Sequence, residues 1–132
     1  DLGSEEILHN WKEGTTITPH VHIVLSDTLA ADEKVQFKLY YSIGDKSELM
    51  SAEASVVAEA TIASGTAART HVLIDFATIA LSTYKIGSMI VCQLWRIAKS
   101  AGGTELSDEP FVVNVGLHYE IDTLGSRAIT AK

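Results

Sequence analysis

The stretch that decides the fold is Ile17–Leu25, with the sequence Ile-Thr-Pro-His-Val-His-Ile-Val-Leu. Side chains alternate between the two faces of a β-strand, so this stretch separates into two sets. The apolar set is Ile17, Pro19, Val21, Ile23 and Leu25, and the other set is Thr18, His20, His22 and Val24. The pattern predicts a strand with one face on a hydrophobic core and two imidazoles on the other face, about 6.5–7 Å apart at the usual strand rise.

Other segments repeat this two-residue rhythm. Residues Val35–Ile43 alternate cleanly, which is typical of a strand with one buried and one wet face. Ser88–Ala98 is apolar on both faces and predicts a central strand covered on both sides. In Phe111–Asp122 the inward face is predicted to be Phe111, Val113, Val115, Leu117, Tyr119 and Ile121.

The remaining segments complete a β pattern. A short strand and a turn are expected in Asp1–Gly14, where Trp11 is predicted to cover the core. Glu53–Ile62 and Arg69–Phe76 are predicted strands, whereas Ala77–Tyr84 fits either a short helix or an irregular crossover.

The predicted fold class is an all-β, antiparallel, jelly-roll-like β-sandwich of about seven or eight strands. A chain of 132 residues is long enough for one independent core, so we expect a single domain over residues 1–132. The tail at residues 123–132 has little to pack and is expected to be an extended arm.

Composition narrows the function classes. The net charge of −7 and the isoelectric point near 5.1 argue against nucleic acid as a partner. No apolar run approaches the roughly 20 residues that cross a bilayer, so no membrane association is expected. The chain does not begin with Met, which predicts a processed product or part of a longer protein. The single Cys92 cannot form an internal disulfide and is predicted to be a buried, inert thiol.

No pattern for nucleophilic or zinc-protease catalysis is present, because both Gly-x-Ser-x-Gly and His-Glu-x-x-His are absent from the sequence. His20-Val21-His22 is the one constellation with metal-binding character. A zinc site needs about four ligands, so the others would come from His118, His71, Asp or Glu, or from symmetry.

Two interpretations of the histidine pair stay open. A trimer with this face on its axis would bring six imidazoles together, a set suited to an octahedral metal such as iron or nickel. In the alternative, both histidines stack on Trp11 or tyrosine rings and hydrogen-bond across strands. A structural transition metal at His20 and His22 is therefore the one cofactor considered.

Four segments together carry a resemblance that covers nearly the whole chain. They are His9-Asn10-Trp11-Lys12-Glu13-Gly14, Thr18-Pro19-His20-Val21-His22, Gly87-Ser88-Met89-Ile90-Val91-Cys92-Gln93-Leu94-Trp95-Arg96, and Val115-Gly116-Leu117-His118-Tyr119-Glu120-Ile121-Asp122-Thr123-Leu124-Gly125-Ser126-Arg127. At this spacing they resemble a family of bacteriophage virion structural proteins. Ile23 and Trp95 depart from the pattern of that family.

The resemblance implies a non-enzymatic β-sandwich that assembles, often as a trimer, as a head fibre, capsid decoration or tail knob. It implies localisation in the virion, a homotrimer and other virion proteins as partners, and no active site. His20, His22 and His118, with Trp11 and Arg96, would belong to one interface surface. The alternative function is a receptor- or carbohydrate-binding tip, in which Tyr40, Tyr84 or Trp95 stack on host-surface glycans.

Overall fold

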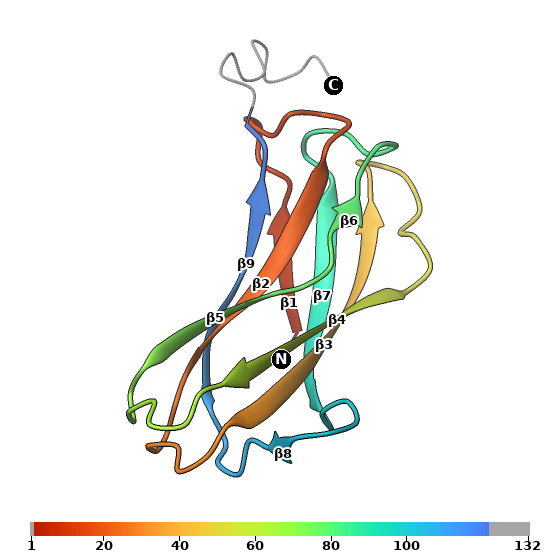
Figure 1. The fold of residues 1–132 in the computed structure, drawn as a ribbon. Coiled ribbons are helices and arrows are strands. Elements are labelled where there is room, and N and C mark those ends of the chain that lie inside the picture. Colours follow the sequence, from red (N-terminus) through yellow and green to blue (C-terminus); the bar gives the residue numbers. More distant parts are fainter. Residues whose placement is uncertain (1, 122–132) are drawn as a thin grey trace.

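The computed structural model describes residues 2–121, which form β-strands in two sheets (Figure 1). The strands are β1 (Leu2–Glu6), β2 (Thr16–Val24), β3 (Glu33–Gly44), β4 (Ala54–Ile62), β5 (His71–Asp75), β6 (Ile79–Ala80), β7 (Met89–Ile97), β8 (Thr104–Glu105) and β9 (Phe111–Tyr119). The predicted all-β antiparallel sandwich is confirmed, while a jelly-roll connectivity stays a prediction. The described strands outnumber the predicted seven or eight because β6 and β8, of two residues each, are too short to leave a sequence pattern.

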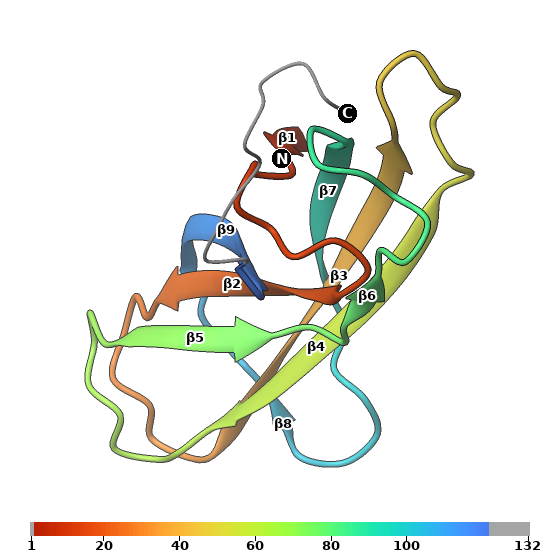
Figure 2. The ribbon, with the colours of Figure 1, turned by 90° about the horizontal axis from the view of Figure 1, so that it is seen from above.

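The two sheets form the two layers of the sandwich (Figure 2). One sheet has the strand order β1-β7-β3-β4, with β8 beside β3. In the other sheet, β2 lies between β9 on one edge and β5 and β6 on the opposite edge. All pairs are antiparallel except the short β3–β8 pair. The strand β2 therefore has hydrogen-bonded neighbours on both edges. This pairing fixes the positions of its outward-facing side chains relative to those of β5 and β9.

Alternation in β2 and β3 predicts the core correctly. Ile17, Val21 and Ile23 are at most 1% exposed, and Phe37 and Leu39 face them from β3 with similar burial. One core cluster joins Val21, Ile23, Phe37 and Leu39 to Ile74 and Phe76. A second cluster contains Ile17 and the buried Trp11. Two apolar sheet faces packed in this way supply the main stabilising term of the fold.

The prediction for β9 is correct over its second half and wrong at its start. Val115, Leu117 and Tyr119 pack inward, as expected. Phe111 and Val113, however, are 66% and 62% exposed. The cause is a β-bulge: His22 pairs with Asn114, but the next residue, Ile23, pairs with Val112, so Val113 has no partner on β2. An extra residue shifts the alternation by one position and moves side chains to the opposite face.

Two other predictions are wrong, and one open alternative is decided. Ile121 was expected to face inward but is 57% exposed. The strand β7 is central, but it is not covered on both faces, because Trp95 is 52% and Met89 is 40% exposed. Residues 77–84 contain β6 and turns and no helix, which leaves the irregular crossover. The expected arm at residues 123–132 lies outside the described residues. Within residues 2–121, no helix has the length and apolarity needed to span a bilayer.

Candidate functional site

Four histidines form a row across the outer face of the four-stranded sheet. The row runs from His118 on β9, through His20 and His22 on β2, to His71 on β5. The ring centroids of successive neighbours are 4.0, 4.8 and 4.9 Å apart. Three adjacent strands thus bring together residues that are up to 98 positions apart in the sequence, and His20 and His22 lie at the centre of the row.

His20 is the most enclosed of the four. It is only 5% exposed, and its ring lies over Gly116, its partner on β9. A Cβ atom at position 116 would lie 2.6 Å from His20 Nε2, so a side chain larger than glycine would displace the ring. His20 Nδ1 is buried and no atom meets hydrogen-bond geometry with it. Buried polar atoms normally have partners, and among the described residues only Trp11 Nε1 also lacks one.

His22 and His71 form the second half of the row. His22 Nδ1 and His71 Nε2 are 2.7 Å apart, and the two rings are stacked with an interplanar angle of 9°. One of these nitrogens must carry a hydrogen and donate it to the other. His22 is therefore hydrogen-bonded to His71, whereas His20 lies closest to His118 and Asp75.

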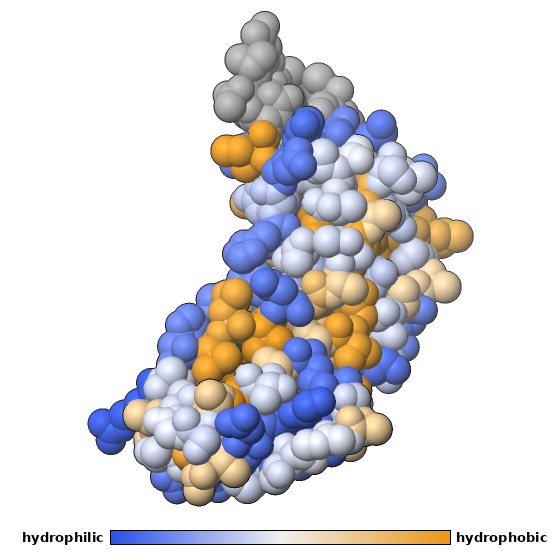
Figure 3. Space-filling model, in the orientation of Figure 1, coloured by the Kyte–Doolittle hydropathy of each residue, from blue (hydrophilic) through white to orange (hydrophobic). Residues whose placement is uncertain are grey.

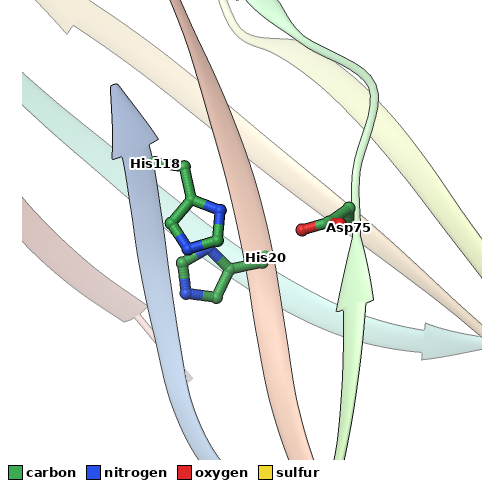
Figure 4. A group of neighbouring side chains, drawn as sticks. All are labelled: His20, Asp75 and His118. Atoms are coloured by element: carbon green, nitrogen blue, oxygen red, sulfur yellow. The ribbon is translucent and has the colours of Figure 1, made fainter. Parts of the chain in front are cut away.

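His20, His118 and Asp75 converge (Figure 4). One potential ligand atom from each of the three lies within 4.8 Å of the other two. Asp75 is the direct partner of His20 on β5, while His118 lies two pairs further along β9, opposite Thr18. Figure 4 shows the two rings between β9 and β2, with the Asp75 carboxylate directed toward them from β5.

The predicted surface residues do not all meet. His20, His22 and His118 lie close together, and His71 and Asp75 lie beside them. From the sequence, His71 and an unspecified Asp or Glu were expected as further possible ligands. Trp11 is 1% exposed and packs in the second core cluster, so it offers no surface to a neighbouring molecule. Arg96 belongs to the other sheet and donates a hydrogen bond to the Leu106 carbonyl at 2.5 Å. The second interpretation expected rings stacked on Trp11 or tyrosine and hydrogen bonds across strands. Within the described residues the ring contacts of His20 and His22 are to other histidines, and the hydrogen bond between His22 and His71 joins two strands.

The surroundings of His20 hold its pKa below the ordinary value of 6.5. Burial is the main cause, and the neighbouring His118 and His22 add to it, while Asp75 and the Thr18 backbone act in the opposite direction. The folded chain therefore binds a proton at His20 less readily than the unfolded chain does. His20 is neutral in the folded protein near pH 7.

We therefore expect the free energy of unfolding to fall as the pH drops below about 6.5. A histidine whose pKa is lower in the folded state makes its full contribution to stability at pH values above its unfolded-state pKa. Below that pKa the stability declines, because the unfolded chain takes up the proton more readily than the folded chain. Urea unfolding in metal-free buffer at pH 7.5 and pH 5.5 measures this change. The His20→Gln variant should show a smaller difference between the two pH values, and an equal difference would contradict the assignment.

A second feature is an opening between the two sheets, lined by residues of β1 and β9. A cleft of about 390 Å³ reaches from this opening to the core, and a neighbouring cleft of about 280 Å³ continues it. Apolar residues of β7 and β9, among them Leu94 and Val115, line the larger cleft. Within the described residues, β1 pairs only with β7 and β9 only with β2, so each presents a free edge here.

Cys92 lines the larger cleft and is half-buried, whereas the sequence predicted a buried thiol. Burial, with a smaller contribution from Glu5, raises the pKa of the thiol to about 11. The thiolate fraction at pH 7.5 is then about 100-fold lower than at the ordinary pKa. We expect maleimide to label Cys92 about 100 times more slowly than free cysteine, measured with an absorbance assay. Labelling as fast as free cysteine would contradict this expectation, and urea-unfolded protein is the control.

Comparisons with protein-family models, with curated proteins and with solved structures found no match for this chain.

Proposed function

We propose that this chain is a non-enzymatic structural protein of a bacteriophage virion, which self-associates as a trimer on the capsid or tail. The observation that carries the self-association is the open side between β1 and β9. The virion setting rests on the sequence resemblance.

Exposed apolar side chains lie at the β9 end of this opening. Phe111, Val112 and Val113 are 66%, 46% and 62% exposed, and we call these three residues the β9 rim. In the orientation of Figure 1, apolar surface is exposed at the middle of the molecule between more hydrophilic regions (Figure 3). Three consecutive apolar residues beside an apolar cleft favour burial against another molecule.

The free edge of β9 also supports association. Edge strands of monomeric proteins are commonly protected by lysine, proline or other charges. The run Phe111–Leu117 contains none of these and has the sequence Phe-Val-Val-Asn-Val-Gly-Leu. Its unpaired backbone groups can bond to a strand of another chain.

The same chain carries both free edges, which favours a second copy as the occupant. The β9 edge of one copy can meet the β1 edge of the next, and this head-to-tail contact buries the β9 rim. Contacts of this kind close into a ring when the rotation between copies allows it. The trimer is the closed ring that the resemblance implies.

Light scattering coupled to size exclusion, at 1–100 µM protein, tests the proposal. We expect a mass near three times the 14.2 kDa of the chain. A mass of one chain across this range would overturn self-association. A stable dimer would retain self-association and overturn the trimer.

A second candidate function is recognition of a host-surface glycan. Trp95 is 52% exposed on the outer face of the five-stranded sheet, and its β3 partner Lys38 precedes Tyr40 by two residues on the same face. An exposed indole is a surface on which a sugar ring can stack. Lys38 Nζ lies over the Tyr40 ring, 4.6 Å from its centroid. Tyr84 instead packs against the second core cluster. A glycan array should then show binding that Trp95→Ala removes, and an array without binding would exclude this candidate.

A further inference from the structure

His20, His118 and Asp75 lie in a geometry close to that of a metal site within one chain. Their potential ligand atoms come from β2, β9 and β5 and lie within 4.8 Å of one another. Ligand atoms around a tetrahedral zinc ion lie about 3.4 Å apart, given bonds of 2.0–2.1 Å. His118 and Asp75 are exposed, so small rotations of their side chains can close the difference.

The central ligand is already held in place. His20 is 95% buried and its ring rests on Gly116, where no Cβ atom occupies the space. Its Nδ1 atom is buried without a hydrogen-bond partner, although almost every buried polar atom in a protein has one. A bound cation would give this nitrogen a partner.

The donor set identifies the class of ligand. Two imidazole nitrogens and a carboxylate are typical of zinc sites that leave one position for water. Imidazole also suits nickel and copper, whereas magnesium and calcium prefer sites made of oxygen atoms. The chain therefore favours a divalent transition metal of the first row.

We propose that His20, His118 and Asp75 bind one divalent first-row transition metal ion, such as Zn²⁺, in each chain. This differs from the site expected on a trimer axis. There, His20 and His22 of three chains would share one ion, whereas here His22 is paired with His71 and all three ligands belong to one chain. The proposal goes beyond the structural function, since it holds for a single chain as well as for an oligomer.

Calorimetric titration of the tag-free, chelator-treated full chain with ZnCl₂ tests the site. We expect one Zn²⁺ per chain and a Kd in the micromolar range or tighter. His118→Ala and Asp75→Asn should each weaken binding at least about 100-fold, because loss of even an outer partner of a ligand costs 10–100-fold. Both positions are exposed, so neither variant should affect folding.

His9→Ala is the matched control, because His9 is an exposed histidine beside Glu6, away from the row. It should bind Zn²⁺ as the unaltered chain does. His71→Ala separates the two halves of the row: binding should persist, and its loss would move the site to His22 and His71 and overturn the proposal. Absence of stoichiometric binding at 100 µM Zn²⁺ would also overturn it.

The stoichiometry separates this proposal from a site on the trimer axis. One ion per chain is expected, and one ion per three chains would overturn the intrachain site. The Co²⁺-loaded protein gives a second measurement, since an intense visible absorption band is expected for four-coordinate Co²⁺ and a weak band for the octahedral set of six imidazoles. If the chain is monomeric, one ion should still bind, so the two proposals can fail separately.

Discussion

Replacing Phe111 and Val113 together by aspartate is expected to convert the oligomer into monomers at micromolar concentration. Both side chains lie on the β9 rim and are more than half exposed in the single chain. In the assembly they would be buried, and burial of an unpaired carboxylate is strongly unfavourable. A loss of only about 2.7 kcal/mol weakens association about 100-fold. Sedimentation velocity measures the change in mass.

The matched control for this variant is Leu49→Asp. Leu49 is 93% exposed and lies in the connection between β3 and β4. The substitution therefore removes an exposed apolar side chain that does not belong to the β9 rim. We expect it to leave the oligomer intact. All three positions are exposed, so the unfolding free energies should change by no more than about 0.5 kcal/mol. If the rim variant keeps the same mass as the unaltered chain, the β9 rim is not the interface.

Replacing Trp11 by alanine is expected to lower the free energy of unfolding by about 3–5 kcal/mol. Trp11 is 1% exposed, packs in the second core cluster and forms a backbone bridge to Ile121. The Nε1 atom of Trp11 is buried without a hydrogen-bond partner, which costs part of the free energy that burial of the ring provides. We therefore expect a loss of unfolding free energy near the lower end of this range. Urea unfolding followed by circular dichroism measures the loss.

Trp95→Ala is the matched control, because it removes the same side chain from an exposed position on β7. We expect a loss below about 1 kcal/mol. If Trp11→Ala does not fold, Trp11→Phe should fold with a smaller loss of stability. Equal effects of the two alanine variants would contradict the core position of Trp11.

The sequence predicts the sandwich well wherever a strand keeps strict alternation. Ile17–Leu25 and Val35–Ile43 have an apolar residue at every second position. The structure buries these residues, except for Tyr41, which is half-buried. Glu53–Ile62 was ambiguous from its alanines, and the surrounding β pattern correctly favoured a strand. Burial of one face therefore determines these elements.

The start of β9 shows where alternation stops being informative. Phe111, Val112 and Val113 are all apolar, so the sequence does not mark the residue that forms the bulge. The shift depends on how β9 pairs with β2, a contact between segments about 90 positions apart. For the same reason the sequence did not reveal the opening beside β9, which supports the proposed self-association.

The candidate site was predicted in part. His20 and His22 were identified from their spacing, and His118 and His71 were named as ligands that folding could supply. Asp75 was not singled out, because nothing in Arg69–Phe76 distinguishes it from other exposed acids. Its pairing with His20 follows from the register of β5 on β2. The grouping of His20 with His118, and of His22 with His71, likewise requires the sheet.

Hydrogen–deuterium exchange of the unaltered chain and of the variant with aspartate at Phe111 and Val113, both at 100 µM protein, tests most directly whether the chain associates through its open side. Exchange in β1 should be slower in the unaltered chain, since a neighbouring chain would cover its free edge. Within the described residues the β4 strand also pairs on one edge only, so it serves as the internal reference and should exchange equally in both proteins. Equal exchange of β1 in the two proteins, or protection of β4 instead, would contradict this account.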